Sequence, residues 1–212
     1  MEIKWLGHSS FLITDSSGRT VLTDPFDNSI GYNSFSGEVD VVTISHHHFD
    51  HDNVENISKN AKIVDKIGLF NVCDIPIQGI PSYHDEVKGA KRGENIIYVL
   101  QMDGYKLCHL GDLGCILSAE QVKQISNVDV LFIPIGGNYT INGKEACQIT
   151  KLIKSHIIIP MHYKTPALTF PLEGLENFLK YMQSAHKVNN NYIKITGNID
   201  DLQSDVRILD YS

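Results

Sequence analysis

The chain has 212 residues, a formal net charge of −7, and a composition that is 42% hydrophobic and 20% charged. These proportions are typical of a folded globular protein and exclude disordered and fibrous classes. The acidic balance excludes a nucleic-acid coat, because no basic surplus neutralises phosphates. A local basic cluster (Lys88, Lys91, Arg92) is interpreted as a solvated loop. The length suits one domain, which we expect to span 1–212.

The expected location of the protein and the redox state of its cysteines depend on features that the sequence lacks. The first residues have neither the basic head nor the long apolar stretch of a secretory signal. No apolar run approaches the roughly 20 residues of a membrane helix. The four cysteines, Cys73, Cys108, Cys115 and Cys147, form no C-x-x-C pair, so we expect reduced, partly buried thiols. We therefore expect a cytoplasmic protein without a membrane partner.

The first part of the chain predicts short strands joined by tight turns. Asp103-Gly104 is a typical hairpin turn, and Ser16-Ser17-Gly18 is another turn sequence. Apolar and β-branched runs favour strands over 2–6, 11–14, 20–23, 40–45, 62–65, 95–101, 106–110 and 128–133.

Helices are predicted later in the chain. Ser118-Ala119-Glu120-Gln121 is a capping box that opens a short helix. The spacing of apolar residues predicts an amphipathic helix over 144–154 and another over 172–182. Strands resume at 157–159, 192–196 and 206–209. Two packed sheets with helices outside, an α+β arrangement, would bury these strands, but periodicity alone does not prove it.

Four of the ten histidines fall within six residues. His46, His48, Asp50 and His51 form an H-x-H-x-D-H motif directly after the β-branched run 40–45. Imidazole nitrogens and carboxylate oxygens are the ligands that zinc and other first-row divalent metals prefer. A histidine-rich loop can also be a surface accident, but the internal position after a buried strand favours a metal site.

Three further candidate ligands follow a turn residue or the end of a predicted strand. His84 follows Pro81-Ser82-Tyr83, Asp112 lies in a loop flanked by glycines, and His162 follows Pro160-Met161. Binding loops gather at such positions. Each residue alone is a weak signal, whereas the series after H-x-H-x-D-H is a strong one.

In this order the motifs resemble the metallo-β-lactamase fold superfamily, and more narrowly its small metal-dependent hydrolases that include the ascorbate-phosphate lactonase-like proteins. The resemblance implies an αββα four-layer sandwich in a single domain, with a dinuclear site at one edge of the sheets. The matching segments are Trp5–Ile13, Leu22–Phe26, Ser45–His51, Ser82–Glu86, His109–Gly114, Pro134–Thr140 and Pro160–Thr165.

The resemblance also implies two divalent metal ions, Zn²⁺ above all, with Mn²⁺ or Fe as alternatives. Asp24 matches the early aspartate that supports the histidine loop. The implied ligands are His46, His48 and His84 for one metal, Asp50, His51 and His162 for the other, and Asp112 as the bridge.

Two residues and the chain length separate this sequence from other branches. Asp112 stands where many true β-lactamases have cysteine, and His48 stands where the flavo-diiron branch has glutamate. A chain of 212 residues leaves no room for the extra domain of the nuclease branch. We therefore expect a metal-dependent hydrolase that uses a metal-bound hydroxide on a small ester, lactone or phosphodiester.

Asp50 is the predicted catalytic residue, because its family position implies that it binds a metal and orients the hydroxide. Candidate proton donors are His8, His109 and Lys164. His8 alternatively ties loops together, and His109 alternatively supports the ligands. Lys164 and Asn138 either meet an anionic substrate or are solvated. His47 is expected to point away from the site, and His156 and His186 to be structural or exposed.

Two alternatives from other classes stay open: a metal-binding or regulatory protein without turnover, and an iron-dependent redox enzyme on the same fold. The expected partner is a small-molecule substrate. The sequence leaves the substrate's identity and any self-association as a homo-oligomer undetermined.

Overall fold

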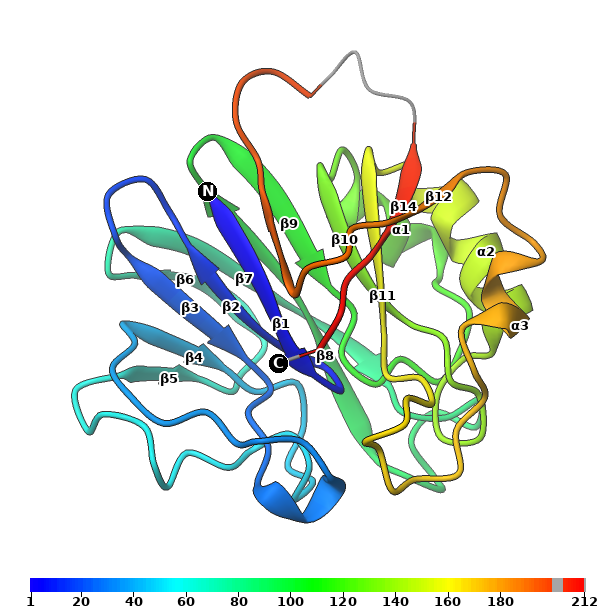
Figure 1. Ribbon diagram of the computed structural model, residues 1–212, viewed down its shortest axis with the longest axis horizontal. Coiled ribbons are helices and arrows are strands. Elements are labelled where there is room, and N and C mark those ends of the chain that lie inside the picture. The colour runs from blue at the N-terminus through cyan, green and yellow to red at the C-terminus, as the bar shows by residue number, and fades with distance from the viewer. Residues whose placement is uncertain (200–203, 212) are drawn as a thin grey trace.

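Two mixed β-sheets stack face to face in the computed structural model, which describes residues 1–199 and 204–211 (Figure 1). The strands of the first sheet are β1 (Glu2–Gly7), β2 (Ser10–Thr14), β3 (Thr20–Thr23), β4 (Val41–Thr43), β5 (Lys62–Val64) and β13 (Tyr192–Lys194). Their order across the sheet is β13-β1-β2-β3-β4-β5. Strands β1 to β3 are antiparallel, whereas β4 and β5 continue parallel to β3.

The second sheet is longer. Its strands are β6 (Gly68–Val72), β7 (Ile75–Tyr83), β8 (Glu94–Met102), β9 (Tyr105–His109), β10 (Val130–Pro134), β11 (Ile157–Met161), β12 (Ala185–Lys187) and β14 (Asp205–Ile208). They follow the order β12-β14-β11-β10-β9-β8-β7-β6. Strands β6 to β9 form antiparallel hairpins, and β9, β10, β11 and β14 run parallel to one another.

The two faces of the first sheet belong to different apolar clusters. Val21 and Val41 lie in the large core between the sheets, whereas their neighbours Leu22 and Val42 belong to a second cluster. This follows from the two-residue period of a strand, which turns successive side chains to opposite faces. Both faces of the first sheet are therefore covered.

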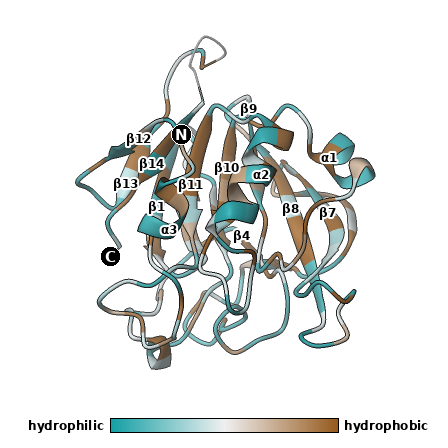
Figure 2. Cartoon of the chain, turned by 90° about the vertical axis from the view of Figure 1, so that its right-hand side faces the viewer, coloured by the Kyte–Doolittle hydropathy of each residue, from teal (hydrophilic) through white to brown (hydrophobic). Residues whose placement is uncertain are grey.

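Helices α1 (Ala119–Ile125), α2 (Gly143–Ile153) and α3 (Glu176–Leu179) lie beside β10 and β11 (Figure 1). Their outward faces are hydrophilic where the adjoining strands are hydrophobic (Figure 2). The predicted capping box of α1 is confirmed, because the Ser118 hydroxyl accepts from the Gln121 amide and the Gln121 side chain accepts from the Ser118 amide.

Loops, together with the short 3₁₀ helix η1 (Asn28–Ile30), cover the outer face of the first sheet. Phe26, Ile30 and Tyr32 from one loop pack there with Leu168 and Leu172 from another. The α+β sandwich is confirmed, with this loop layer in the place of a helical layer within the described residues.

The predicted helix over 172–182 is wrong for most of its length. Only Glu176–Leu179 is α-helical. The Glu173 backbone is used elsewhere, since its N–H donates to Gly136 O at 2.8 Å and its carbonyl accepts from Lys164 N at 2.9 Å. Leu172 packs in the outer cluster while Phe178 packs in the main core, so the apolar residues do not share one helical face.

Strands β6, β7 and β12 were not expected. Pro76 and Pro81 weaken the strand signal of β7, because a proline cannot donate to a sheet ladder. Pro81 lies beyond the pairing of β7 with β6, which covers Ile75 to Gly79, and pairs only with β8. His84 therefore follows the end of a nine-residue strand rather than an isolated turn.

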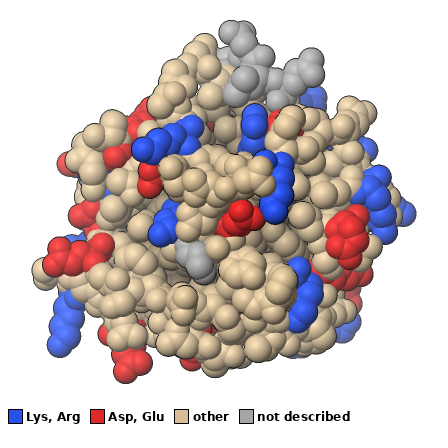
Figure 3. Space-filling model, in the orientation of Figure 1, with Lys and Arg blue, Asp and Glu red and all other residues tan. Residues whose placement is uncertain are grey.

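The surface carries mixed charge. Lysines, arginines and acidic residues are interspersed over the face of the molecule in Figure 3. In the described part of the chain, every helix is too short or too polar to cross a bilayer.

Cys108 and Cys147 are buried and Cys115 is partly buried, but Cys73 is exposed, so the expectation of partly buried thiols is wrong for Cys73.

Candidate metal centre

Every predicted ligand follows the carboxyl end of a strand. The loop with His46, His48, Asp50 and His51 comes after β4, His84 directly after β7, Asp112 after β9, and His162 directly after β11. Strands β7, β9 and β11 share one direction, so their carboxyl ends meet at the same edge of the second sheet. The fold thus brings residues more than 100 positions apart to one place.

The predicted ligands form two adjoining groups. In one, ligand atoms of His46, His48 and His84 lie within 4.8 Å of one another. In the other, the same holds for His8, Asp50, His51 and His162. The family resemblance implied these two groups apart from His8.

Asp112 lies between the two groups. Its Oδ2 is 3.3 Å from His84 Nε2 in the first group and 3.1 Å from His162 Nε2 in the second. The same oxygen is 3.3 Å from His51 Nε2 and 4.0 Å from His46 Nε2. This central position is the one expected for a carboxylate shared by two cations.

Several atoms of this cluster are buried without a hydrogen-bond partner among the described residues: His46 Nε2, His51 Nε2 and Asp112 Oδ1. Buried polar atoms normally have partners, since an unpaired one costs free energy. Here imidazole and carboxylate ligand atoms converge without hydrogen-bond partners. The residues therefore fit divalent cations such as zinc.

Burial and mutual electrostatics set the protonation of the cluster. Burial, with His51 nearby, lowers the pKa of His46 to about 2. Burial opposes ionisation of Asp112, but His162 and His51 hold its pKa well below the usual range. Burial also opposes a charge on His51, yet Asp112 and Asp24 raise its pKa well above normal. His46 is thus neutral and Asp112 ionised, as ligation requires, while His51 must lose its proton to bind a cation.

Asp24 orients the histidine loop. This aspartate is fully buried and has a left-handed backbone, with φ of 38°. Its Oδ2 accepts from His51 Nδ1 at 2.9 Å and from Ser45 Oγ at 2.6 Å, and its Oδ1 accepts from Ser45 N at 2.8 Å. Because His51 donates through Nδ1, its Nε2 faces the centre.

The Asp112 loop depends on close contacts that a larger residue would block. Gly111 has φ of 56°, and a Cβ there would lie 2.3 Å from Asn95 Oδ1. That oxygen accepts from the Asp112 backbone N–H at 2.9 Å, and Asn95 Nδ2 donates to Leu110 O. Asn95 is thus a positioning residue that no sequence motif indicated.

His8 ties loops together, which is one of the two roles expected for it. Its Nε2 lies 3.1 Å from Asp50 Oδ2, and its ring centroid is 4.3 Å from that of His162. Burial and nearby His162 lower its pKa to about 4, so a neutral imidazole donates to Asp50. The His8 carbonyl also accepts from His162 N at 3.1 Å.

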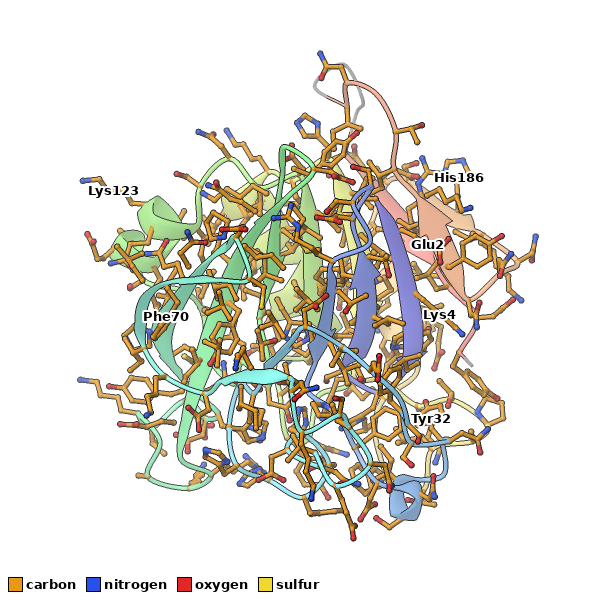
Figure 4. All side chains as sticks on the ribbon, turned by 90° about the vertical axis from the view of Figure 1, so that its left-hand side faces the viewer. Glu2, Lys4, Tyr32, Phe70, Lys123 and His186 are labelled. Carbon is orange, nitrogen blue, oxygen red and sulfur yellow. The ribbon has the colours of Figure 1, made fainter. Side chains whose placement is uncertain are left out.

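The chain reaches His8 through Gly7, which has φ of 115°. A Cβ at Gly7 would lie 2.6 Å from the ring of Tyr32, which stands near the lower end of the first sheet in Figure 4. This close approach explains the glycine in the Gly-His pair.

Three other candidate residues, His109, Asn138 and Lys164, are hydrogen-bonded to backbone carbonyls outside the ligand groups. His109 Nε2 donates to Ser9 O at 2.8 Å. Asn138 donates to Pro171 O, and Lys164 donates to the carbonyls of Leu168 and Phe170. In each case the polar side chain is hydrogen-bonded to the backbone of a neighbouring loop.

Two histidines point to solvent. The His47 side chain is 64% exposed, and its Nδ1 lies 3.3 Å from Asp52 Oδ2. His186 is equally exposed and pairs with Asp205 on the far part of the second sheet, where Figure 4 labels it.

A cavity of about 580 Å³ opens over the cluster. Phe49, Arg92, Tyr139 and Phe170 line it together with His48, Asp50, His84, Asp112 and His162. No role at the site was predicted for these aromatic side chains or for Arg92, although Phe49 lies inside the histidine motif and Tyr139 inside the matching segment Pro134–Thr140.

The comparisons with known proteins agree with this geometry. The family model described as "Beta-lactamase superfamily domain" matches residues 2–162. A protein of Methanoculleus marisnigri named "UPF0173 metal-dependent hydrolase" is 29% identical, over 86% of this chain and 89% of its own. One of the same name from Staphylothermus marinus is 31% identical, over 77% of this chain and 83% of its own.

A solved structure is more similar still. It is that of a Thermotoga maritima protein proposed to be a Zn-dependent hydrolase of the metallo-β-lactamase superfamily, 36% identical with a TM-score of 0.82. The match covers 99% of both chains. The chain belongs to the metallo-β-lactamase superfamily and, within it, to the group of metal-dependent hydrolases.

Proposed function

We propose that this protein hydrolyses a small ester, lactone or phosphodiester with the help of two divalent cations. The observation that carries the proposal is Asp112, whose Oδ2 lies within 3.3 Å of one histidine from each ligand group. Zn²⁺ is the proposed native metal, with Mn²⁺ or Fe as alternatives, because the cluster offers imidazole and carboxylate ligands.

The proposed ligands are His46, His48 and His84 on one side, Asp50, His51 and His162 on the other, and Asp112 between them. When bound, two such cations lower the pKa of a water from 15.7 towards about 7 and polarise the oxygen of the bond to be cleaved.

Asp50 is the proposed catalytic residue. Its carboxylate lines the cavity, and its pKa is lowered because contacts with His8 and His51 outweigh the effect of burial. An ionised carboxylate facing substrate can orient the attacking water and accept a proton. His8 donates to Asp50 Oδ2 and so holds it in place. His109 and Lys164, which donate to backbone carbonyls away from the cavity, are given no role as proton donors.

The cavity of about 580 Å³ suits a small molecule. A small-molecule substrate therefore remains the proposed partner, and a cytoplasmic location remains a proposal as well.

Removal and return of metal test the proposal. We expect protein stripped with a chelator to lose turnover of 4-nitrophenyl acetate, a homoserine lactone or bis(4-nitrophenyl) phosphate, and to regain it with Zn²⁺ or Mn²⁺. Spectrophotometric and pH-stat assays of this panel measure both states. Metal uptake without turnover of any member would favour the metal-binding alternative. An absorbance band from bound iron would favour the redox alternative.

A further inference from the structure

The mouth of the cavity carries an arginine and three aromatic rings that belong to neither ligand group. Arg92 Cζ lies 5.4 Å from the ring centroid of Tyr139. The Tyr139 ring is 6.5 Å from Phe170, whose ring is 6.1 Å from Phe49. Phe49 is 59% exposed and Tyr139 38% exposed. Aromatic rings left in water beside a polar cavity are typical of a ligand-binding groove.

Arg92 has no carboxylate partner among the described residues, unlike the other two arginines. Arg19 Nε lies 2.6 Å from Asp15, and Arg207 Nε lies 2.9 Å from Asp205. Arg92 is a partly exposed residue, and its guanidinium packs against Tyr139 instead. A positive charge at the mouth of this cavity is therefore free to pair with a ligand.

The loop that carries Arg92 has a fixed shape. The carboxylate of Asp85 accepts backbone N–H bonds from Val87, Gly89, Lys91 and Arg92, at 2.8 to 2.9 Å. Asp85 follows the proposed ligand His84 directly. The backbone of Arg92 is therefore anchored beside the ligand cluster, and little ordering is needed when a ligand binds.

Arg92 also lines two neighbouring cavities. Besides the cavity over the cluster, it lines a neighbouring one of about 530 Å³, and His47 and His48 line both. A substrate whose scissile bond lies at the cluster can thus extend past the guanidinium without leaving the protein surface.

We propose that Arg92 selects substrates with an anionic group a few bonds from the scissile bond, while Tyr139 and Phe170 pack against an apolar part of the same molecule. The guanidinium fork matches the geometry of carboxylate, phosphate or sulfonate. This proposal rests on the proposed function and names the substrate class of that site.

The test uses two esters that differ only in a remote charge, mono-4-nitrophenyl adipate and its neutral methyl ester. The measured quantity is the ratio of kcat/KM for the anionic ester to that for the neutral ester. We expect Arg92→Gln to lower this ratio about tenfold, since a charged hydrogen-bonded pair is lost. Arg92→Lys should restore part of it. The matched control is Lys91→Gln, which removes the adjacent exposed cation that pairs with Glu86 and should leave the ratio unchanged.

An equal ratio in the wild type and Arg92→Gln would overturn the proposal. If the wild type hydrolyses neither ester, the proposed function fails on these substrates, and binding decides the role of Arg92 separately. Calorimetric titration with naphthalene-2-sulfonate then measures affinity without turnover. Weaker binding by Arg92→Gln than by Lys91→Gln supports the anion subsite, and absent or equal binding overturns it.

Discussion

Asp112→Asn is expected to lower kcat about a thousandfold or more. The loss of the shared carboxylate costs several kcal/mol of stabilisation of the bound cations and of the charge that develops in the transition state. The Asp112 carboxylate is buried, and its Oδ2 lies 3.1 to 4.0 Å from four histidines. An asparagine of nearly equal size fills the same space without the charge. Steady-state assays and metal analysis of the purified variant measure the effect.

The fold should survive this change, since Asp112 N would still donate to Asn95 Oδ1. The control is Asp205→Asn. Asp205 is another largely buried aspartate, and it pairs with His186 on β12 and with Arg207 on β14. The control variant should keep full turnover and metal content. Wild-type turnover by Asp112→Asn protein that was stripped and reloaded would contradict the assigned role.

Asp24→Ala is expected to weaken metal affinity about 10- to 100-fold, as loss of a partner that orients a metal-ligating histidine does. It should also destabilise the protein by about 3 kcal/mol, because buried donors lose their acceptor. Three donor atoms, His51 Nδ1, Ser45 Oγ and Ser45 N, depend on this carboxylate. Metal titration and denaturant unfolding of metal-free protein separate the two effects.

Asp15→Ala is the matched comparison for Asp24→Ala. Asp15 is also buried and accepts from Ser17 and Arg19, but it lies in the turn between β2 and β3. Asp15→Ala should lower the free energy of unfolding without changing metal affinity. If Asp24→Ala bound metal as tightly as Asp15→Ala, the orienting role of Asp24 would be wrong.

Most of the side chains that the fold brings together in this cluster stand out in the sequence because they lie in short local patterns. His46, His48, Asp50 and His51 form one short motif, and His162 follows a predicted strand, whereas His84 was indicated only by the turn sequence before it. A strand that ends on a polar, metal-ligating side chain is visible in the sequence alone. Apolar runs of strand length likewise indicated most of the strands, but their arrangement in an α+β sandwich was implied by the family resemblance.

What the sequence could not predict depends on contacts between distant segments. Helical spacing over 172–182 is overridden by backbone hydrogen bonds in which Glu173 donates to Gly136 O and accepts from Lys164 N. The strand β7 contains Pro76 and Pro81, and only its pairing partners show where these are tolerated. Propensity is a weak signal when tertiary contacts compete with it.

The cavity mouth could not be predicted either. Arg92 was interpreted as part of a solvated basic loop, and only the folded chain places it against Tyr139, 47 residues later. Asn95 gives no motif, yet it holds the Asp112 loop. Such residues act through the geometry of loops from separate strands, which local sequence does not encode.

The most direct measurement is the metal content per chain, by elemental analysis of untagged protein after reloading and removal of free metal. We expect two equivalents of zinc or manganese in the wild type and at most one in Asp112→Asn. One equivalent in the wild type would contradict a shared carboxylate at Asp112, and no uptake at all would contradict the assignment of these histidines and aspartates as a metal centre.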